Sequence, residues 1–409
     1  MNVLYHHRTR GQDVEAVHIR GIVGGLRGLG HRVDVVSPPG VDVERAPSAV
    51  AAAAGGAPAA QPGRPSPWSF ISRRAPESLF EGIEVAYNAY AWPALEARLV
   101  RGGYRLLYER YALFSLAGVL AARRHRLPCI LEVNDSAVVS RIRPLKLQAA
   151  ARRVERFVWQ RADAIVTITS YFRDLILETG VAPERVFVIP NAVDDAAFRA
   201  AGDGAEVRAR LGLDGKVTIG YVGAINFWRR VDLLVNAFAH LAARHPSAHL
   251  VLIGDGPDRE GVAERARALG LDGRVTFTGK VPHAEIPAHL AALDVAVIPH
   301  SNTYGSPMKL FEYMAAGRLV VAPWLPPIVS VIGEDDGGVL FPPLDEAGLT
   351  AALDGLLADP IRRRTLGARA REKVMSDYVW RRHAETILTI FGRLGAPFTP
   401  TGPLTGAGA

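Results

Sequence analysis

Two basic stretches stand where helices are expected to begin, a position that usually favours acidic side chains. The segment HSNTYGSPMKLFEYMAAG predicts a helix over residues 307–316, with Ser306 as its N-cap and Pro307 at its first position. Lys309 then lies in the first turn, where the helix dipole costs a cation about 0.3–1 kcal/mol unless an anion lies nearby. The alternative is a pair with Glu312, worth about 0.2–0.5 kcal/mol.

The second basic helix start is in AINFWRR, which follows the apolar segment VTIGYVG. Arg229 and Arg230 precede a helix whose apolar positions are Leu233, Leu234, Ala237, Phe238 and Leu241. A solvated basic edge is the alternative interpretation. Because two strand-to-helix loops share this reversed polarity, we expect them to bind one polyanion such as a diphosphate.

Two further features fit a nucleotide. Glu312 lies one turn beyond Lys309 on the same helix face, and its carboxylate can accept hydrogen bonds from both hydroxyls of a ribose. The loop HHRTRGQD follows the first expected strand. Gly11 would allow a close backbone approach there, while Arg8 and Arg10 add positive charge.

Short apolar strands alternate with amphipathic helices, such as the one expected over residues 13–29. This alternation predicts an α/β protein with two Rossmann-like domains, each built on a parallel, doubly wound sheet. The expected strands of the first domain are residues 2–7, 32–37, 104–109, 128–134, 164–170 and 185–191. Those of the second are residues 217–223, 249–256, 274–279, 294–300, 318–323 and 338–343.

The chain is expected to divide at a glycine-rich stretch near residue 213. We predict a first domain over residues 1–212 and a second over 213–380. A C-terminal helix over 381–395 is expected to pack back on the first domain, and residues 396–409 to form a flexible tail. An Ala-, Pro- and Gly-rich insertion, at about residues 40–68, is expected to be mobile.

The cysteine count, the absence of long apolar segments and the net charge limit the classes of protein to consider. The 409 residues include a single cysteine, Cys129, so no intrachain disulfide or cysteine-rich metal site can form. No signal peptide or membrane-spanning segment is evident, and we expect a cytoplasmic protein. The net charge of +7 suggests an anionic partner. A basic segment at residues 141–161 leaves open a peripheral contact with the inner membrane face.

Several segments together resemble the retaining GT-B glycosyltransferases of the large fourth family, which use nucleotide-diphosphate sugars. They are GYVGAINFWRRVDLLVNAF, the stretch from LIGDGPD to DVAVIP, VIPNAVD and SPMKLFEYMAAGRLVVAP. The resemblance covers nearly the whole chain apart from the insertion and tail. It implies the GT-B fold, in which two Rossmann-like domains face each other, with the first domain on the acceptor side and the second binding the nucleotide sugar.

The resemblance also implies roles for single residues of the donor site. Glu312 matches the second glutamate of the family's Glu-x7-Glu motif, which holds the ribose, and Arg229 matches its phosphate-binding lysine. The backbone near Met308 and Lys309 would contact the diphosphate. Gly223 matches the glycine that precedes the phosphate-binding position. The remaining donor-site positions implied are Val281 and Lys280 at the nucleobase loop, and Tyr304, Gly305 and Ser306 in the loop before the helix.

This sequence departs from the family pattern at three positions. Tyr304 replaces the first glutamate of the motif, and Ala224 replaces an arginine that usually accompanies the phosphate-binding lysine. Asn134 stands where many members have a histidine near the sugar. Lys309, absent from the commonest form of the motif, can restore the charge lost at Ala224. Asp135, next to Asn134, could orient an acceptor or simply cap its loop.

We therefore expect a hexosyltransferase that needs no metal, with Arg229, Lys309, Asn134 and Asp135 near the chemistry. A UDP-sugar donor is favoured, with a GDP-sugar next, and the reaction is expected to retain configuration at the sugar. The acceptor, a glycan, lipid carrier or small natural product, is left open, as is the oligomeric state. Alternatives are a sugar-nucleotide epimerase, or a protein that binds nucleic acid or an anionic membrane. A dinucleotide-dependent oxidoreductase is disfavoured because no strand is followed by GxGxxG.

Overall fold

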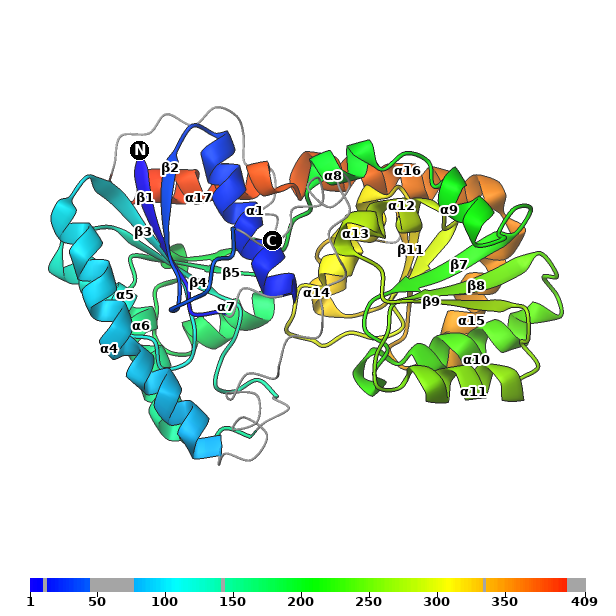
Figure 1. Ribbon diagram of the computed structural model, residues 1–409, viewed down its shortest axis with the longest axis horizontal. Helices are drawn as coiled ribbons and strands as arrows, with labels where there is room; N and C mark the ends of the chain where they lie inside the picture. The colour runs from blue at the N-terminus through cyan, green and yellow to red at the C-terminus, as the bar shows by residue number, and fades with distance from the viewer. Residues whose placement is uncertain (10–12, 45–76, 141–143, 334–335, 396–409) are drawn as a thin grey trace. The chain divides into compact units, whose positions relative to one another are not determined.

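The computed structural model describes residues 1–9, 13–44, 77–140, 144–333 and 336–395. Within these ranges the chain forms two compact units, each described by itself (Figure 1). Unit 1 contains the described residues up to Ile189 together with those from Arg381 onwards, and unit 2 contains those from Pro190 to Trp380. Most of the expected insertion and the whole of the expected tail lie outside the described residues.

Unit 1 is built on a six-stranded sheet in which all strand pairs are parallel. Its strands, in sheet order, are β2 (Arg32–Val36), β1 (Asn2–His6), β3 (Tyr104–Arg110), β4 (Cys129–Val133), β5 (Ala164–Thr167) and β6 (Val186–Val188). The side chains of β4 and β5 are buried along both faces of the sheet. Such continuous burial is typical of a parallel sheet covered by helices on both sides.

The helices of unit 1 connect these strands or pack on the sheet. They are α1 (Asp13–Gly28), α4 (Glu77–Arg101), α5 (Ala117–Arg124), α6 (Gln148–Arg161), α7 (Ser170–Leu177) and α17 (Trp380–Arg393), with a short 3₁₀ turn at Pro183–Arg185. The chain reverses its direction across the sheet after β2, so right-handed connections place α1 and α4 on opposite faces. His383 of α17 lies edge-on to His18 of α1, with ring centroids 5.9 Å apart.

Unit 2 contains a second parallel six-stranded sheet. Its strands, in sheet order, are β12 (Gly338–Phe341), β11 (Leu319–Pro323), β10 (Val295–Val297), β7 (Val217–Val222), β8 (Ala248–Ile253) and β9 (Val275–Gly279). All twelve expected strands are therefore present. The expected class, α/β with two parallel doubly wound sheets, is confirmed.

Two apolar cores cover the faces of the unit 2 sheet. One core includes α10 (Val231–Ala242), α11 (Arg259–Ala268) and α15 (Glu346–Ala358). The other includes residues of α8 (Asp195–Ala200), α12 (Ile286–Ala291), α13 (Met308–Ala315), α14 (Pro326–Val329) and α16 (Pro360–Asp377). Helix α9 (Ala205–Arg210) contacts α12. Short 3₁₀ turns lie at Phe227–Arg229 and His283–Glu285. The apolar residues expected on the buried face of α10 are all buried.

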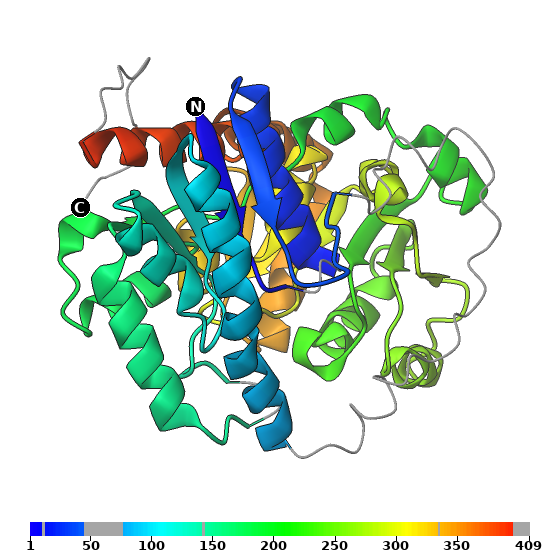
Figure 2. The same ribbon diagram turned by 60° about the vertical axis from the view of Figure 1, so that its left-hand side comes forward.

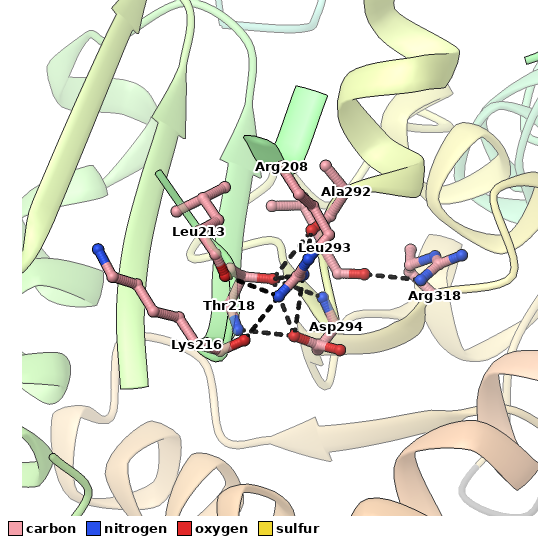
Figure 3. Close-up of polar contacts among 8 residues, drawn as sticks. All are labelled: Arg208, Leu213, Lys216, Thr218, Ala292, Leu293, Asp294 and Arg318. Atoms are coloured by element: carbon pink, nitrogen blue, oxygen red, sulfur yellow. Dashed lines mark hydrogen bonds and ion pairs between the residues drawn. The ribbon is translucent and has the colours of Figure 1, made fainter. Parts of the chain in front are cut away.

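The division between the units falls earlier than the expected boundary near residue 213, and Arg208 of α9 gives a physical reason (Figure 3). Its guanidinium donates to the carbonyl oxygens of Lys216 at 2.7 Å, Ala292 at 2.8 Å and Leu213 at 2.9 Å. It also lies 3.5 Å from the Asp294 carboxylate. These bonds tie α9 to the amino ends of β7 and β10, so residues 190–212 belong with unit 2.

Candidate functional site

The order of the strands in unit 2 reverses between β7 and β10. From β7 the chain proceeds to β8 and β9, and it then returns to place β10, β11 and β12 on the other side. Loops that leave the carboxyl ends of two such neighbouring strands diverge, and ligands of doubly wound sheets bind at this point. Here the loops are residues 223–230 after β7 and 298–307 after β10.

Glycines let the loop after β7 pack against the loop after β8. Gly223 and Gly254 have φ angles of +139° and +137°, which side chains rarely allow. A Cβ on Gly254 would lie 2.1 Å from the carbonyl oxygen of Gly223, and one on Gly256 would lie 2.1 Å from that of Ile225. Ile225 N–H also donates to the Asp255 carbonyl at 3.0 Å. The two backbones are therefore fixed in direct contact.

Lys309, in the first turn of α13, extends to this glycine loop. Its Nζ donates to the Tyr221 hydroxyl at 3.1 Å and lies 4.2 Å from the centre of the Tyr221 ring. Tyr221 in turn donates to the Ala224 carbonyl at 2.8 Å. A Cβ on Gly223 would lie 2.8 Å from Nζ, so the ammonium group covers that glycine. Lys309 thus brings a positive charge to the loop that lacks an arginine at Ala224.

Arg229 places a second positive charge beside Lys309. Burial lowers the pKa of Lys309 well below its usual value, and the charge of Arg229 lowers it further, while the charge of Glu312 opposes this. Neither side chain forms an ion pair with a carboxylate anywhere in the described parts of the chain. Arg230 differs, because its guanidinium binds the Asp232 carboxylate at 3.0 Å. Of the two arginines expected near an anion, the structure leaves Arg229 available.

Glu312 lies one turn further along α13. Its carboxylate is 15% exposed and is 3.7 Å from His283 Nε2. Burial raises the pKa of Glu312, while the charges of His283 and Lys309 oppose that rise. His283 follows Val281 in the loop after β9, so this loop meets α13 at the glutamate. Lys280 of that loop is exposed and Val281 is partly buried.

The start of α13 differs from the prediction. The helix begins at Met308, Pro307 is its N-cap residue, and the Ser306 hydroxyl does not cap it. Instead, the Ser306 hydroxyl accepts a hydrogen bond from Asn191 N–H at 3.1 Å, and the Ser306 carbonyl accepts one from the Asn191 amide at 2.6 Å. The first-turn amides of Met308 and Lys309 have no acceptor within the helix. Tyr304 and Gly305 lie in the same loop, partly exposed.

Sequence reasoning missed three side chains at this site: Tyr221, His283 and His300. His300 ends the segment DVAVIPH, and its buried Nδ1 has no hydrogen-bond partner among the described residues. Burial and the charges of Arg230 and Arg229 lower its pKa, which favours a neutral imidazole. Its place directly after a buried strand was the available signal, because functional side chains gather at strand ends.

The expected residues of the first domain lie in unit 1. Asn134 donates to Glu132, a buried carboxylate that also contacts His18 Nε2 at 2.9 Å and the Tyr108 hydroxyl at 2.8 Å. The charges of His18 and Arg110 hold the pKa of Glu132 well below its usual value despite its burial. Asp135 accepts a hydrogen bond from Ser136 N–H, in the manner of a loop cap.

The basic loop after β1 is described only in part. Arg8 pairs with Glu84 at 3.0 Å, and Gly11 and Arg10 lie outside the described residues. Of the basic segment at 141–161, residues 148–161 form α6, on which Arg152, Arg153 and Arg156 are exposed. In the described residues no helix has the length and apolar character of a membrane span. The membrane contact stays a prediction.

Metal-ligating side chains do not cluster in the described part of the chain: no group of three or more His, Cys, Asp or Glu residues is placed to hold an ion. Asp255 accepts a hydrogen bond from Gly256 N–H at 2.8 Å. Asp258 precedes α11 without capping it through its side chain.

Comparison with protein families gives two matches that together span most of the chain. Residues 15–192 match the model described as "Glycosyl transferase 4-like domain". Residues 204–373 match the model described as "Glycosyl transferases group 1". Apart from Asn191, the residues of the site described in unit 2 all lie within the second match.

Individual proteins are similar over comparable lengths. D-inositol 3-phosphate glycosyltransferase of Kineococcus radiotolerans is 32% identical, over 73% of this chain and 73% of its own length. The 2-deoxystreptamine glucosyltransferase of Streptomyces kanamyceticus is 33% identical, over 60% of this chain and 65% of its own. The crystal structure of Anabaena Alr3699/HepE in complex with UDP has a TM-score of 0.69 at 17% identity, covering 96% of this chain and all of that one. This last likeness shows the GT-B fold.

Proposed function

Because the chain belongs to the group 1 glycosyl transferases, we propose that unit 2 binds a nucleotide-diphosphate sugar through Arg229 and Lys309. The enzyme is a glycosyltransferase, and the proposal concerns its donor, its acceptor and its site. A UDP-sugar is the favoured donor, with a GDP-sugar next. A structural neighbour crystallised with UDP supports this order.

One observation carries the proposal: the charges of Arg229 and Lys309 act on each other, and neither side chain forms an ion pair with a carboxylate among the described residues. Two like charges in a partly buried place repel each other, and burial adds a desolvation penalty. A diphosphate would remove both costs, since its oxygens accept charge-assisted hydrogen bonds from both groups. The first-turn amides of α13 add donors directed at the same anion.

The same groups would act on the reaction itself. Transfer breaks the bond between the anomeric carbon and the diphosphate oxygen, and negative charge grows on the departing diphosphate. Each well-placed donor contributes about 2.7–4 kcal/mol to such a transition state, by analogy with oxyanion holes. We propose a front-face reaction with retention, in which the leaving phosphate accepts the proton of the acceptor hydroxyl. The charge is met by Arg229 and Lys309 rather than by a metal ion.

Glu312 is proposed to hold the ribose. A carboxylate accepts hydrogen bonds from two adjacent hydroxyls, and Glu312 is one helical turn from Lys309. His283, 3.7 Å from it, opposes the rise in the pKa of Glu312 that burial causes. The backbone at Val281, in the same loop as His283, is proposed to contact the nucleobase.

The acceptor is proposed to be a small polyhydroxylated molecule. Support comes from two relatives whose names specify D-inositol 3-phosphate and 2-deoxystreptamine, both hydroxylated six-membered rings. At the carboxyl end of β4, Asn134 Oδ1 has no hydrogen-bond partner among the described residues and can accept from a hydroxyl. Asn134 and Asp135 follow that strand directly.

A nucleotide panel tests the donor. The thermal unfolding of the full chain is measured with UDP, GDP, TDP and ADP, each also as its sugar conjugate, and turnover is followed with cyclitol acceptors. We expect a selective rise in Tm with one base, UDP first, and sugar transfer only when an acceptor is added. Turnover of the nucleotide sugar without acceptor would favour the epimerase. No rise with any nucleotide would contradict the proposal.

A further inference from the structure

Helix α4 of unit 1 directs polar side chains inwards along its first half. Buried Glu81 accepts backbone hydrogen bonds from Lys146 at 2.6 Å and Leu147 at 2.7 Å. Asn88 accepts from Leu116 N–H and donates to the Phe114 carbonyl, both at 2.8 Å. The inner face therefore binds the protein through hydrogen bonds over this half, where an apolar stripe is usual for a helix on a sheet.

The outer face of α4 is apolar along its length. Between Leu79 and Val100 every exposed residue is apolar, aromatic or glycine. Leu79 and Ile83 are each 49% exposed, Tyr90 is 40% exposed and Val100 is 74% exposed. Figure 2 shows α4 running along unit 1 on the side nearest the viewer. An exposed apolar patch of this extent marks an interaction surface.

The spacing of this face points to another helix as its partner. Its central line alternates steps of four and three residues, which is the seam of a coiled coil. We name it the α4 stripe, formed by Leu79, Ile83, Ala86, Tyr90, Pro93, Ala97 and Val100. Binding to a lipid surface does not require alternating steps of four and three residues. It would favour basic residues flanking the apolar ones, and Arg101 is the one exposed charge from Leu79 to the helix end.

We propose that the α4 stripe packs antiparallel against the α4 stripe of a second copy of this chain. With a twofold axis at Tyr90, Leu79 of one copy meets Val100 of the other, and Ile83 meets Ala97. Ala86 meets Pro93, and Tyr90 meets its own counterpart. Leu79 and Ile83 thus oppose smaller side chains, no like charges meet, and the two helix dipoles are antiparallel. Such self-complementarity is what a twofold interface requires.

The size of the contact sets its strength. The 25 residues of α4 span about 37 Å. A strip about 10 Å wide along that length covers about 370 Å² per copy, against about 800 Å² per partner in a stable complex. The dimer is therefore expected to form reversibly with rising concentration.

Sedimentation equilibrium of the full chain, over roughly two decades of micromolar concentration, tests the dimer. The mass is expected to rise from 44.1 kDa towards twice that value. Tyr90→Glu and Tyr90→Lys should each remain monomeric, because like charges then meet at the axis. An equal mixture of the two should recover the dimer, because opposite charges meet instead. Melting curves check that both variants fold.

Ile361→Glu is the matched control, since Ile361 is 68% exposed on α16 of unit 2 and is not part of the α4 stripe, and its variant should dimerise like the wild type. The proposal is overturned if the wild type stays monomeric, or if Tyr90→Glu associates as the wild type does. Failure of the mixture to associate would contradict the antiparallel pairing. A monomer that sediments with anionic phospholipid vesicles, and loses this on Ile83→Glu, would show that a lipid surface covers the stripe instead.

Discussion

Holding Lys309 and Arg229 near each other costs the folded protein free energy. Lys309 loses hydration, and the pKa of its ammonium falls because burial and Arg229 both disfavour the charged form. Its recorded side-chain contacts are with Tyr221, whose hydroxyl and ring face offer partial rather than full negative charge. An anionic ligand would supply a full negative charge in direct contact with the Lys309 ammonium.

This arrangement predicts how nucleotide affinity depends on pH. The unbound pKa of Lys309 lies below 10.5, and a bound diphosphate would raise it, so the complex holds more protons. Affinity should be full below the unbound pKa and then fall by up to about tenfold per pH unit above it. Titration calorimetry between about pH 8 and about pH 10 checks this. Tyr221 does not titrate there, because burial raises its pKa.

Lys309→Arg is the control for that experiment, since a guanidinium stays charged throughout the range. Its affinity for the nucleoside diphosphate should be nearly independent of pH. Equal slopes for Lys309→Arg and the wild type would assign the pH dependence to another group.

The basic helix starts were visible in the sequence because helix polarity is a local property. The residues that contact these helix starts could not be predicted, because they are distant in the sequence. Arg230 looks equivalent to Arg229 in the sequence, yet it is paired with Asp232. Ser306 is a residue type common at N-caps. Its hydroxyl and carbonyl instead accept hydrogen bonds from Asn191, 115 residues away.

Among the elements, the loops after β7 and β8 position the site through glycine. The φ angles of Gly223 and Gly254 and their close backbone contact require the absence of side chains. Because the Lys309 ammonium covers Gly223, a shift of either loop would move the proposed anion site.

A pair of glycine variants tests this dependence. Gly254→Ala places a Cβ 2.1 Å from the Gly223 carbonyl at a φ of +137°. We expect it to lower the free energy of unfolding by about 1–3 kcal/mol and to weaken nucleotide binding. Gly261→Ala in α11 meets nothing within 4 Å, and should raise stability by about 0.5–1 kcal/mol with binding unchanged. Chemical denaturation and calorimetry measure both. Wild-type binding by Gly254→Ala would refute the role of the loop contact.

The strands themselves were predictable, since twelve apolar segments bounded by turn residues carry their own signal. The boundary between the units was not. The prediction assigned residues 190–212 to the first domain, whereas the bonds from Arg208 to the ends of β7 and β10 attach them to unit 2.

For the molecule as a whole, the family match and the two parallel sheets agree with the expected GT-B glycosyltransferase. The α4 stripe was not recognised in the sequence. Periodicity alone does not say which side of a helix faces the protein, and α4 has its apolar seam outside and Glu81 and Asn88 inside.

The most direct test measures nucleotide binding by the wild type, Arg229→Met, Lys309→Met and the double variant. Calorimetry compares the nucleoside diphosphate that raises Tm most with its parent nucleoside. Each single variant should lose at least about tenfold in affinity for the diphosphate, about 1.4 kcal/mol, and none for the nucleoside. A folded double variant that binds the diphosphate within about twofold of the wild type would contradict the proposed site.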